Sequence, residues 1–193
     1  MLSYRQKYST MKKIETGFKG LYLLQPSVFE DDRGYFYESW NEQLFEKLDI
    51  PNDFKQDNQS KSVKNVLRGL HFQCAPFAQA KLVRVVSGAV LDVAVDLRVG
   101  SPTYGQTYTA ILSEVNKTQM YIPVGFAHGF LTLEDNTVFS YKCSNFYNKE
   151  SEGSLRWDDP DLAIEWELKE SAILSGKDAI APLFKDFISP FKY

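Results

Sequence analysis

Two histidines, His71 and His128, are the only ones in the chain, and both lie in glycine-rich, aromatic surroundings. Residues 68–73 read RGLHFQ, and residues 123–130 read PVGFAHGF. Histidine can act as a base at neutral pH because its ordinary pKa is about 6.5. For a lone histidine beside Phe and Leu, the alternative is a structural role in which the ring satisfies buried polar groups. The residues around each histidine leave both interpretations open.

The two histidines do not form a metal-binding pattern. They are far apart in sequence, and neither belongs to a His-x-His cluster followed by a later Glu and His. A mononuclear metal site needs about three protein ligands with supporting hydrogen bonds. Cys74 and Cys143 also lack metal-type spacing, so we expect two free buried thiols and no disulfide. The sequence therefore predicts no metal and no other cofactor.

Composition and charge argue against several classes of function. The formal net charge of -3 gives no general attraction to the phosphates of nucleic acid. No apolar run approaches the roughly 20 residues that a membrane-spanning helix needs. The first ten residues, MLSYRQKYST, lack the apolar segment and cleavage site of a secretory signal. We expect a cytoplasmic protein that binds neither nucleic acid nor a membrane.

The elements that must position any site are mainly β-strands. Residues 81–86 and 90–98 are rich in Val and Leu, and Ser87 with Gly88 between them favours a hairpin. Further strands are predicted at residues 107–113, 119–122 and 137–145, with the spacing of an antiparallel sandwich or barrel. Helix is scarce. The best candidate covers residues 43–48, with Asn41 as its cap.

The strand predicted at residues 90–98 has two chemically different faces. Apolar and polar side chains alternate along it, with Leu91, Val93, Val95 and Leu97 on one face and Asp92, Asp96 and Arg98 on the other. The polar face either contacts solvent, as in a half-buried antiparallel strand, or lines a barrel that holds a ligand. The alternation alone does not decide between these two arrangements.

No linker, repeat or low-complexity segment divides the chain. The first ten residues show no hydrophobic periodicity, and a second methionine, Met11, directly precedes Lys12, Lys13 and Ile14. We therefore predict an N-terminal extension at residues 1–10 and a single domain at residues 11–193.

A series of short motifs runs along most of the chain. They are residues 32–38 (DRGYFYE), 56–62 (QDNQSKS), 66–73 (VLRGLHFQ), 79–83 (QAKLV), 88–98, 101–105 (SPTYG), 122–130, 157–160 (WDDP) and 175–178 (SGKD). In this order, they resemble the family of dTDP-4-dehydrorhamnose 3,5-epimerases. The resemblance implies a mainly β fold, a cupin-like antiparallel jelly-roll barrel with few short helices. It also implies a homodimer that binds a nucleotide sugar inside the barrel without a metal.

The resemblance further implies a reaction at the carbons beside a ketone. In a 4-keto hexose the hydrogens on C3 and C5 are both alpha to the carbonyl, so loss of either proton gives a planar enolate. Inversion needs a base on one face, an acid on the other, and a positive charge near the carbonyl oxygen. By resemblance, His71 is the base, Asp178 orients its ring, Tyr141 is the acid and Lys81 is the cation. In isolation, Tyr141 would be one of eleven tyrosines, and only its motif distinguishes it.

The same resemblance assigns residues to substrate binding. Arg68 matches a contact to the diphosphate, and Arg33 matches a second one that comes from the neighbouring subunit. Arginine suits this task because its planar group can donate two parallel hydrogen bonds to phosphate. His128 and Asp92 match supporting positions inside the barrel. Contacts around the nucleotide and sugar are matched by Phe36, Glu38, Gln56 and Asn58.

The reaction implied by the family converts dTDP-4-dehydro-6-deoxy-D-glucose into dTDP-4-dehydro-L-rhamnose, in the biosynthesis of dTDP-L-rhamnose. Three alternatives remain: an epimerase acting on C3 or C5 alone or on a related nucleotide sugar, a non-catalytic sugar-binding jelly roll, and a metal-dependent cupin oxygenase. The presence of His71, Tyr141 and Asp178 together favours catalysis over binding alone. The motifs do not separate double from single epimerases.

Overall fold

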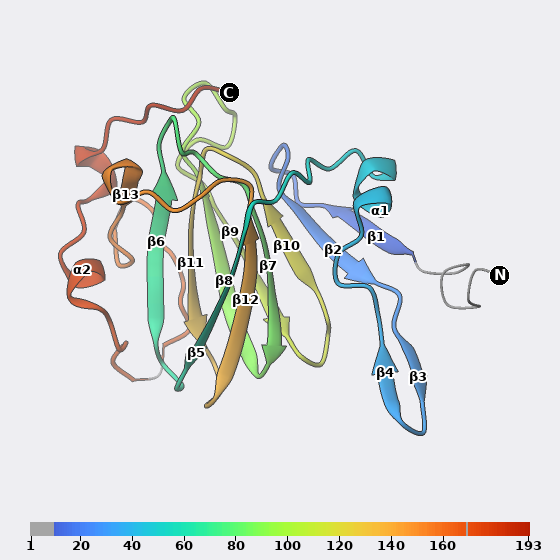
Figure 1. Ribbon diagram of the computed structural model, residues 1–193. Helices are drawn as coiled ribbons and strands as arrows, with labels where there is room; N and C mark the ends of the chain where they lie inside the picture. The colour runs from blue at the N-terminus through green and yellow to red at the C-terminus, as the bar shows by residue number, and fades with distance from the viewer. Residues whose placement is uncertain (1–9, 169) are drawn as a thin grey trace.

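The protein is described by a computed structural model that covers residues 10–168 and 170–193 (Figure 1). Its strands are β1 (Met11–Glu15), β2 (Tyr22–Pro26), β3 (Phe29–Asp31), β4 (Gly34–Phe36), β5 (Gln56–Ser62), β6 (Leu67–Gln73), β7 (Lys81–Ser87), β8 (Ala89–Asp96), β9 (Thr107–Ser113), β10 (Gln119–Ile122), β11 (Phe126–Thr132), β12 (Thr137–Cys143) and β13 (Glu152–Ser154). The α-helices of this part of the chain are α1 (Glu42–Lys47) and α2 (Gly176–Ala179), and 3₁₀ turns cover Lys149–Ser151 and Phe184–Asp186. The prediction of a mainly β fold with few short helices is confirmed. The predicted extension at residues 1–10 lies, apart from Thr10, outside the described residues.

Two antiparallel sheets pack face to face and enclose the interior (Figure 1). One sheet has the strand order β1-β2-β10-β7-β12-β5, and the other has the order β13-β6-β11-β8-β9. β3 and β4 pair only with each other and form a hairpin that projects away from both sheets (Figure 1). The sandwich therefore leaves an interior between the sheets in which side chains from both can meet.

Apolar side chains fill part of this interior. Val83 and Val85 of the six-stranded sheet pack with Phe126 and Phe130 of the five-stranded sheet, together with Phe139 from β12. Each of these strands contributes alternate residues to the interior, as the period of two in a β-strand requires. Burial of large apolar side chains is the main favourable contribution to holding the two sheets together.

The outer faces of the sheets are also covered. Leu91 and Val93 of β8 pack against Leu155, Leu162 and Trp166, which belong to the long C-terminal segment. This segment, with α2, runs along the outside of β6 (Figure 1). On the six-stranded sheet, the cover is provided by α1. Its Phe45 is fully buried in a cluster with residues of β7 and β10.

Burial of β8 decides between the two arrangements that its alternating pattern left open. Every residue of Ala89–Asp96 is buried, and Asp92 and Asp96 are both 0% exposed. The polar face therefore lies inside the protein and not in solvent. Asp92 is on the face that lines the interior between the sheets, because its neighbours two residues away, Val90 and Ala94, belong to the interior cluster.

The hairpin predicted at Ser87 and Gly88 is wrong. β7 pairs with β10 and β12, whereas β8 pairs with β9 and β11 in the other sheet. Gly88 has a φ of +80°, and a Cβ on it would lie 2.5 Å from the Thr137 side chain. The turn is therefore a tight corner that carries the chain from one sheet to the other. Local turn residues specify a change of direction, but the strand's partners decide which sheet it joins.

The remaining predicted elements agree with the structure. β9 and β10 have the predicted bounds, and β12 ends two residues earlier than expected. The predicted helix is α1, and the side chain of Asn41 accepts a hydrogen bond from the Leu44 amide at 3.2 Å. None of the helices in the described part of the chain is long and apolar enough to span a membrane.

Candidate active site

His71 and His128 lie directly opposite each other on the adjacent strands β6 and β11. The two strands approach closely because Gly69 and Gly129 meet there without side chains. A Cβ on Gly69 would lie 2.5 Å from the Cα of Gly129 and 2.7 Å from the carbonyl oxygen of His128. Gly69 also has a φ of +122°, which L-residues with a Cβ rarely adopt. The glycines noted beside both histidines in the sequence therefore set the spacing of the two strands that carry them.

His71 forms a hydrogen-bonded pair with Asp178, which lies 107 residues further along the chain. The distance from His71 Nε2 to Asp178 Oδ1 is 2.5 Å, and the two side chains are 26% and 3% exposed. Burial raises the pKa of Asp178, but hydrogen bonds from His71 and Ser175 outweigh it, so the net shift lowers that pKa. An ionised Asp178 accepts a hydrogen bond from Nε2 and leaves Nδ1 of His71 as the nitrogen that can accept a proton.

His128 forms a second such pair with Asp92 on the neighbouring strand β8. His128 Nε2 lies 3.1 Å and 3.0 Å from the two oxygens of Asp92, and the side chains are 7% and 0% exposed. Burial lowers the pKa of His128 against the opposing effect of the carboxylate. Burial also raises the pKa of Asp92. The interior thus disfavours charge on both members of this pair.

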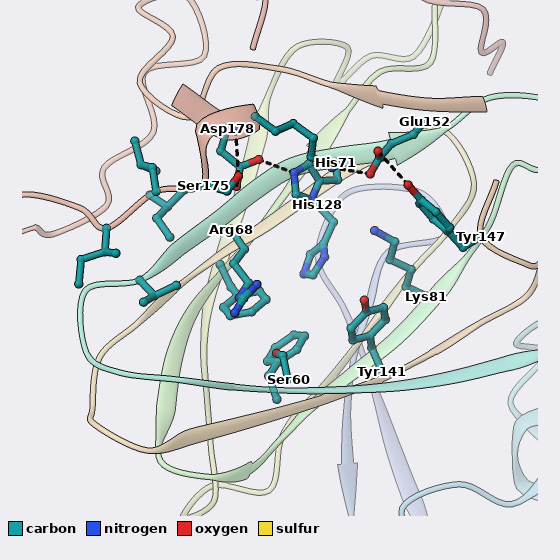
Figure 2. Close-up of a pocket in the computed structure, with 17 residues that line it drawn as sticks. Ser60, Arg68, His71, Lys81, His128, Tyr141, Tyr147, Glu152, Ser175 and Asp178 are labelled. Carbon is teal, nitrogen blue, oxygen red and sulfur yellow. Dashed lines mark hydrogen bonds and ion pairs between the residues drawn. The ribbon is translucent and has the colours of Figure 1, made fainter. Parts of the chain in front are cut away.

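Tyr141 on β12 and Lys81 on β7 approach from the opposite sheet (Figure 2). Tyr141 pairs with Val83, and the next inward-facing residue, Cys143, pairs with Lys81. Burial raises the pKa of the Tyr141 phenol, so the hydroxyl carries its proton at neutral pH. Burial lowers the pKa of Lys81, although nearby acidic groups oppose this. No described residue hydrogen-bonds to the Tyr141 hydroxyl or to Lys81 Nζ, so both polar ends are available to a ligand.

These side chains line one cavity of about 600 Å³ between the sheets (Figure 2). Part of its wall is apolar, because Phe130 and Phe139 stack with ring centroids 4.1 Å apart. Arg68 of β6 extends into the cavity, and its guanidinium donates to Ser62 Oγ at 3.2 Å and 3.3 Å. It forms no ion pair with any carboxylate in the described part of the chain. Its charge is therefore available for an anionic ligand.

A second cavity of about 320 Å³ adjoins the first and shares His71, Lys81 and Tyr141 with it. Gln56 and Asn58 of β5 line this second cavity, and Gln56 Nε2 donates to Asn58 Oδ1 at 2.9 Å. The combined space has basic, acidic and cationic groups at its centre and amide groups at one end. Such a site can abstract a proton from one face of a bound molecule and return one to the other.

Comparison with known proteins shows which family the chain belongs to. The family described as dTDP-4-dehydrorhamnose 3,5-epimerase matches residues 15–186 of the chain. The chain belongs to this family. The predictions of an epimerase family and of an isomerase are therefore confirmed.

Individual relatives of this epimerase agree over most of their length. The dTDP-4-dehydrorhamnose 3,5-epimerase of Salmonella typhimurium is 53% identical over 171 residues, which are 88% of this chain and 93% of the relative. The crystal structure of the enzyme from Elizabethkingia anophelis is 56% identical, with a TM-score of 0.87 and coverage of 91% and 97% of the two chains. A crystal structure from Legionella pneumophila, in complex with dTDP-4-keto-L-rhamnose, is 49% identical, with a TM-score of 0.87 and coverage of 91% and 93%. The likeness confirms the predicted cupin-like jelly roll.

Three predicted binding residues of this epimerase lie away from the cavity of their own chain. Arg33 and Phe36 belong to the projecting β3–β4 hairpin, and neither lines the two central cavities. Arg33 ion-pairs with Asp31 within the hairpin at 2.5 Å. Glu38 accepts a hydrogen bond from Asn41 at 3.1 Å, close to α1. Of the other nine predicted residues, eight line the two central cavities, and Asp92 contacts one of these, His128. The structure therefore brings these nine together, but not the three described above.

Several cavity residues were not predicted as site residues. Tyr147, Glu152 and Lys177 also line the cavity. Lys177 Nζ is 2.6 Å from Glu152 Oε1, and the Tyr147 hydroxyl is 3.4 Å from Glu152 Oε2, with Tyr147 and Glu152 at one side of the cavity (Figure 2). Ser60 and Ser175 also line it. The SGKD motif at residues 175–178 includes Ser175 and Lys177, but only its Asp178 was predicted as a site residue. Tyr147 and Glu152 belong to no quoted motif.

The donor atoms of this epimerase show no metal-type grouping. Among the described residues, no set of three or more His, Cys, Asp and Glu side chains could hold a metal ion. Cys74 and Cys143 are free thiols, half-buried and buried respectively. Each histidine uses Nε2 to contact one carboxylate. A reaction without metal remains a prediction.

Proposed function

We propose that this epimerase inverts C3 and C5 of dTDP-4-dehydro-6-deoxy-D-glucose by proton transfer to His71 and from Tyr141, giving dTDP-4-dehydro-L-rhamnose. The observation that carries the proposal is the placement of a base and an acid on facing sheets around one cavity (Figure 2). A sugar ring between the sheets presents one face to each of them. The Legionella pneumophila relative, crystallised with dTDP-4-keto-L-rhamnose, supports this nucleotide sugar as the substrate class.

The first step is removal of a proton from C3 or C5. His71 Nδ1 takes the proton, and the C–H electron pair passes into the enolate of the 4-keto group. Asp178 holds the opposite nitrogen of the ring and stabilises the imidazolium that forms. The planar enolate then receives a proton on its other face from the Tyr141 hydroxyl, which is still protonated because burial raises its pKa. His71 then releases its proton to solvent and Tyr141 regains one from solvent, so that both can act again, and repetition at the second carbon completes the reaction.

The developing enolate oxygen requires a positive neighbour. Lys81 extends into the cavity from the same sheet as Tyr141 and has no hydrogen-bonding partner among the described residues. Preorganised charge in a site shielded from water stabilises a transition state more strongly than it does in bulk water. We assign this role to Lys81. The His128–Asp92 pair supports the cavity wall beside it and orients the bound sugar.

The nucleotide half of the substrate requires cations for its diphosphate. Arg68 supplies one from within the chain. Arg33, Phe36 and Glu38 do not line the cavity of their own chain, and the hairpin carrying Arg33 and Phe36 projects outward. We propose that a homodimer forms in which this segment contacts the cavity of the partner, where Gln56 and Asn58 complete the nucleotide contacts. Closed two-fold dimers are the commonest soluble assemblies.

Sedimentation equilibrium tests the dimer at concentrations used for the assay. A dimer is expected, and Arg33→Ala should raise KM for the nucleotide sugar while leaving the dimer intact. A monomer with full activity would exclude the shared site but would leave the roles of His71 and Tyr141 in place.

Deuterium incorporation tests the reaction itself. dTDP-4-dehydro-6-deoxy-D-glucose is incubated with the protein in heavy water, beside a His71→Ala control, and the label is counted by mass spectrometry. Enzyme-dependent deuterium at both C3 and C5, lost in the control, is the expected result. Label at one carbon would indicate a single-centre epimerase, and no label at either would refute catalysis on this substrate.

We also propose that residues 11–193 act as one catalytic domain in the cytoplasm. β1 begins at Met11 and pairs along its whole length with β2, so the domain includes the strand that starts there. A chain beginning at Met11 should retain the activity of the full protein. Cell fractionation with an antibody to the chain tests the compartment.

A further inference from the structure

The carboxylate of Asp178 has a different partner on each oxygen. Oδ1 contacts His71 Nε2 at 2.5 Å, and Oδ2 accepts a hydrogen bond from the Ser175 hydroxyl at 2.9 Å (Figure 2). Ser175 also accepts a hydrogen bond, from the Asp178 amide at 3.2 Å. The same hydroxyl thus contacts both the backbone and the side chain of Asp178. Together these contacts fix the position of the carboxylate and its rotation about the last side-chain bond.

We propose that Ser175 is a positioning residue that acts through Asp178 on His71, so that the carboxylate presents Oδ1 to the imidazole. The proposal rests on the proposed function, because it assigns Ser175 a part in the action of the base. Loss of a group that orients a metal-bound histidine typically costs about 10- to 100-fold in activity or metal affinity, and we take the lower end of this range for a group acting through Asp178. The alternative is a purely structural role, in which Ser175 serves only as the N-cap of α2.

Local structure explains why the carboxylate depends on this contact. α2 has only four residues, Gly176–Ala179, so its own hydrogen bonds fix the Asp178 side chain weakly. Asp178 itself is 2% exposed. The other ionisable groups that line its cavity are His71 and Arg68 from β6, Lys81 from β7, His128 from β11, Tyr141 from β12, Glu152 from β13, Lys177 from α2, and Tyr147. Because Lys177 already pairs with Glu152, Ser175 is the remaining described donor on Oδ2.

Three substitutions separate the two roles of Ser175. Ser175→Thr keeps the hydroxyl. Ser175→Ala removes it and also costs the helix its cap, whereas Ser175→Gly removes it but retains most of the cap's stability, because glycine is tolerated at an N-cap. If Ser175 positions Asp178, alanine and glycine should both lower kcat about 10-fold with little change in KM. Threonine should restore kcat to near the wild-type value.

The pH profile and the histidine resonances provide readouts that a purely structural cap does not move. Loss of the Ser175 hydrogen bond raises the pKa of Asp178. On the acid side of the pH profile, the alanine and glycine variants should therefore begin to lose activity at a higher pH than wild type does. Because the chain has only two histidines, ¹⁵N-histidine labelling gives two assignable sets of signals. Ser175→Gly should shift the Nε2 resonance of His71 and leave that of His128 unchanged.

Two outcomes would overturn the inference. Glycine at position 175 with wild-type kcat, pH profile and His71 resonance would show that Ser175 is only a helix cap. Threonine as inactive as alanine would show that the hydroxyl is not what matters. Failure of the wild-type protein to exchange label would instead refute the proposed function, and the His71 resonance would then decide the positioning role alone.

Discussion

The two histidine–aspartate pairs of this epimerase use the same atoms in different surroundings. In each pair Nε2 of the histidine contacts an aspartate, and the two histidines are opposite neighbours on β6 and β11. His71 is 26% exposed and contacts one oxygen of Asp178, which belongs to the C-terminal segment. His128 is 7% exposed and contacts both oxygens of Asp92, which is on a central strand. Both histidines line the cavity, but only the first pair combines a partly exposed imidazole with a single short contact to its carboxylate.

We infer from the difference that burial decides whether such a pair can transfer protons. Burial lowers the pKa of His128, since a charged imidazole would have to be removed from water. His128 also lines the cavity, but its side chain is 7% exposed against 26% for His71. His71 meets the cavity directly, and the ionised Asp178 stabilises the imidazolium that proton uptake creates. We therefore predict that the same two residue types make a base in one place and a supporting part of the cavity wall in the other.

The largest expected effect separates the two histidines. His71→Asn should lower epimerisation about 1000-fold, because it removes the general base. His128→Asn should lower it only about 10-fold, because the loss is one of orientation. Steady-state assays of both variants against the nucleotide sugar check this. Equal losses from the two substitutions would break the distinction between a base and a wall.

The next effect separates base from acid across the cavity. Tyr141→Phe should reduce inversion about 100-fold, because the phenol that returns the proton is lost. His71 can still remove a proton and return one from the same face, so deuterium should enter the sugar without inversion. Mass spectrometry of the label and NMR of the product's configuration measure the two quantities separately. Parallel loss of exchange and inversion would place Tyr141 in the first step.

Lys81 is expected to matter through charge. Lys81 lies near both histidine–aspartate pairs. It lines the cavity with His71, and its charge lowers the pKa of His128, although burial lowers that pKa more. Lys81→Met keeps the length of the side chain and removes the charge, and turnover should fall about 100-fold. Lys81→Arg is the matched control and should retain more activity than methionine. Wild-type turnover in the methionine variant would refute the role in stabilising the enolate.

Parts of the fold could be predicted from local sequence because they depend on neighbouring residues. Thr107–Ser113 and Gln119–Ile122 are short runs of strand-forming residues, and Asn41 is a side chain that caps the helix beginning at the next residue. The corner at Ser87 and Gly88 could not be predicted, because the same turn serves a hairpin or a change of sheet. β6 and β11 were not predicted as strands, since Gly69 and Gly129 interrupt their β-forming residues.

The site was even less accessible to local pattern. His71 meets Asp178 over 107 residues, and His128 meets Asp92 over 36, so no periodicity relates either pair. The polar face of β8 could have been solvent-exposed until its partners on both sides were known. Family resemblance singled out Tyr141 among eleven tyrosines, and the structure then placed it opposite His71. The roles of these residues remain predictions for the experiments above.

The smallest expected effect is a difference in how stability responds to acid. The pKa of Asp178 is lowered by its hydrogen bonds despite burial, whereas burial raises the pKa of Asp92. The ionised Asp178 therefore contributes stability above the ordinary aspartate value of 3.8, and this is lost as pH falls below it. For Asp92, the folded protein takes up the proton before the unfolded chain does. Its contribution thus improves as pH falls toward 3.8.

Urea unfolding of Asp178→Asn and Asp92→Asn between pH 7 and pH 3 measures both signs against wild type. The stability advantage of wild type over Asp178→Asn should shrink in acid, and that over Asp92→Asn should grow. Because Asp92 raises the pKa of His128, the Asp92 comparison is made in a His128→Asn background, which removes that titration from both proteins. Slopes of the same sign would mean that the pKa values of the two carboxylates are shifted in the same direction. The contrast between the two pairs would then rest only on the greater exposure of His71.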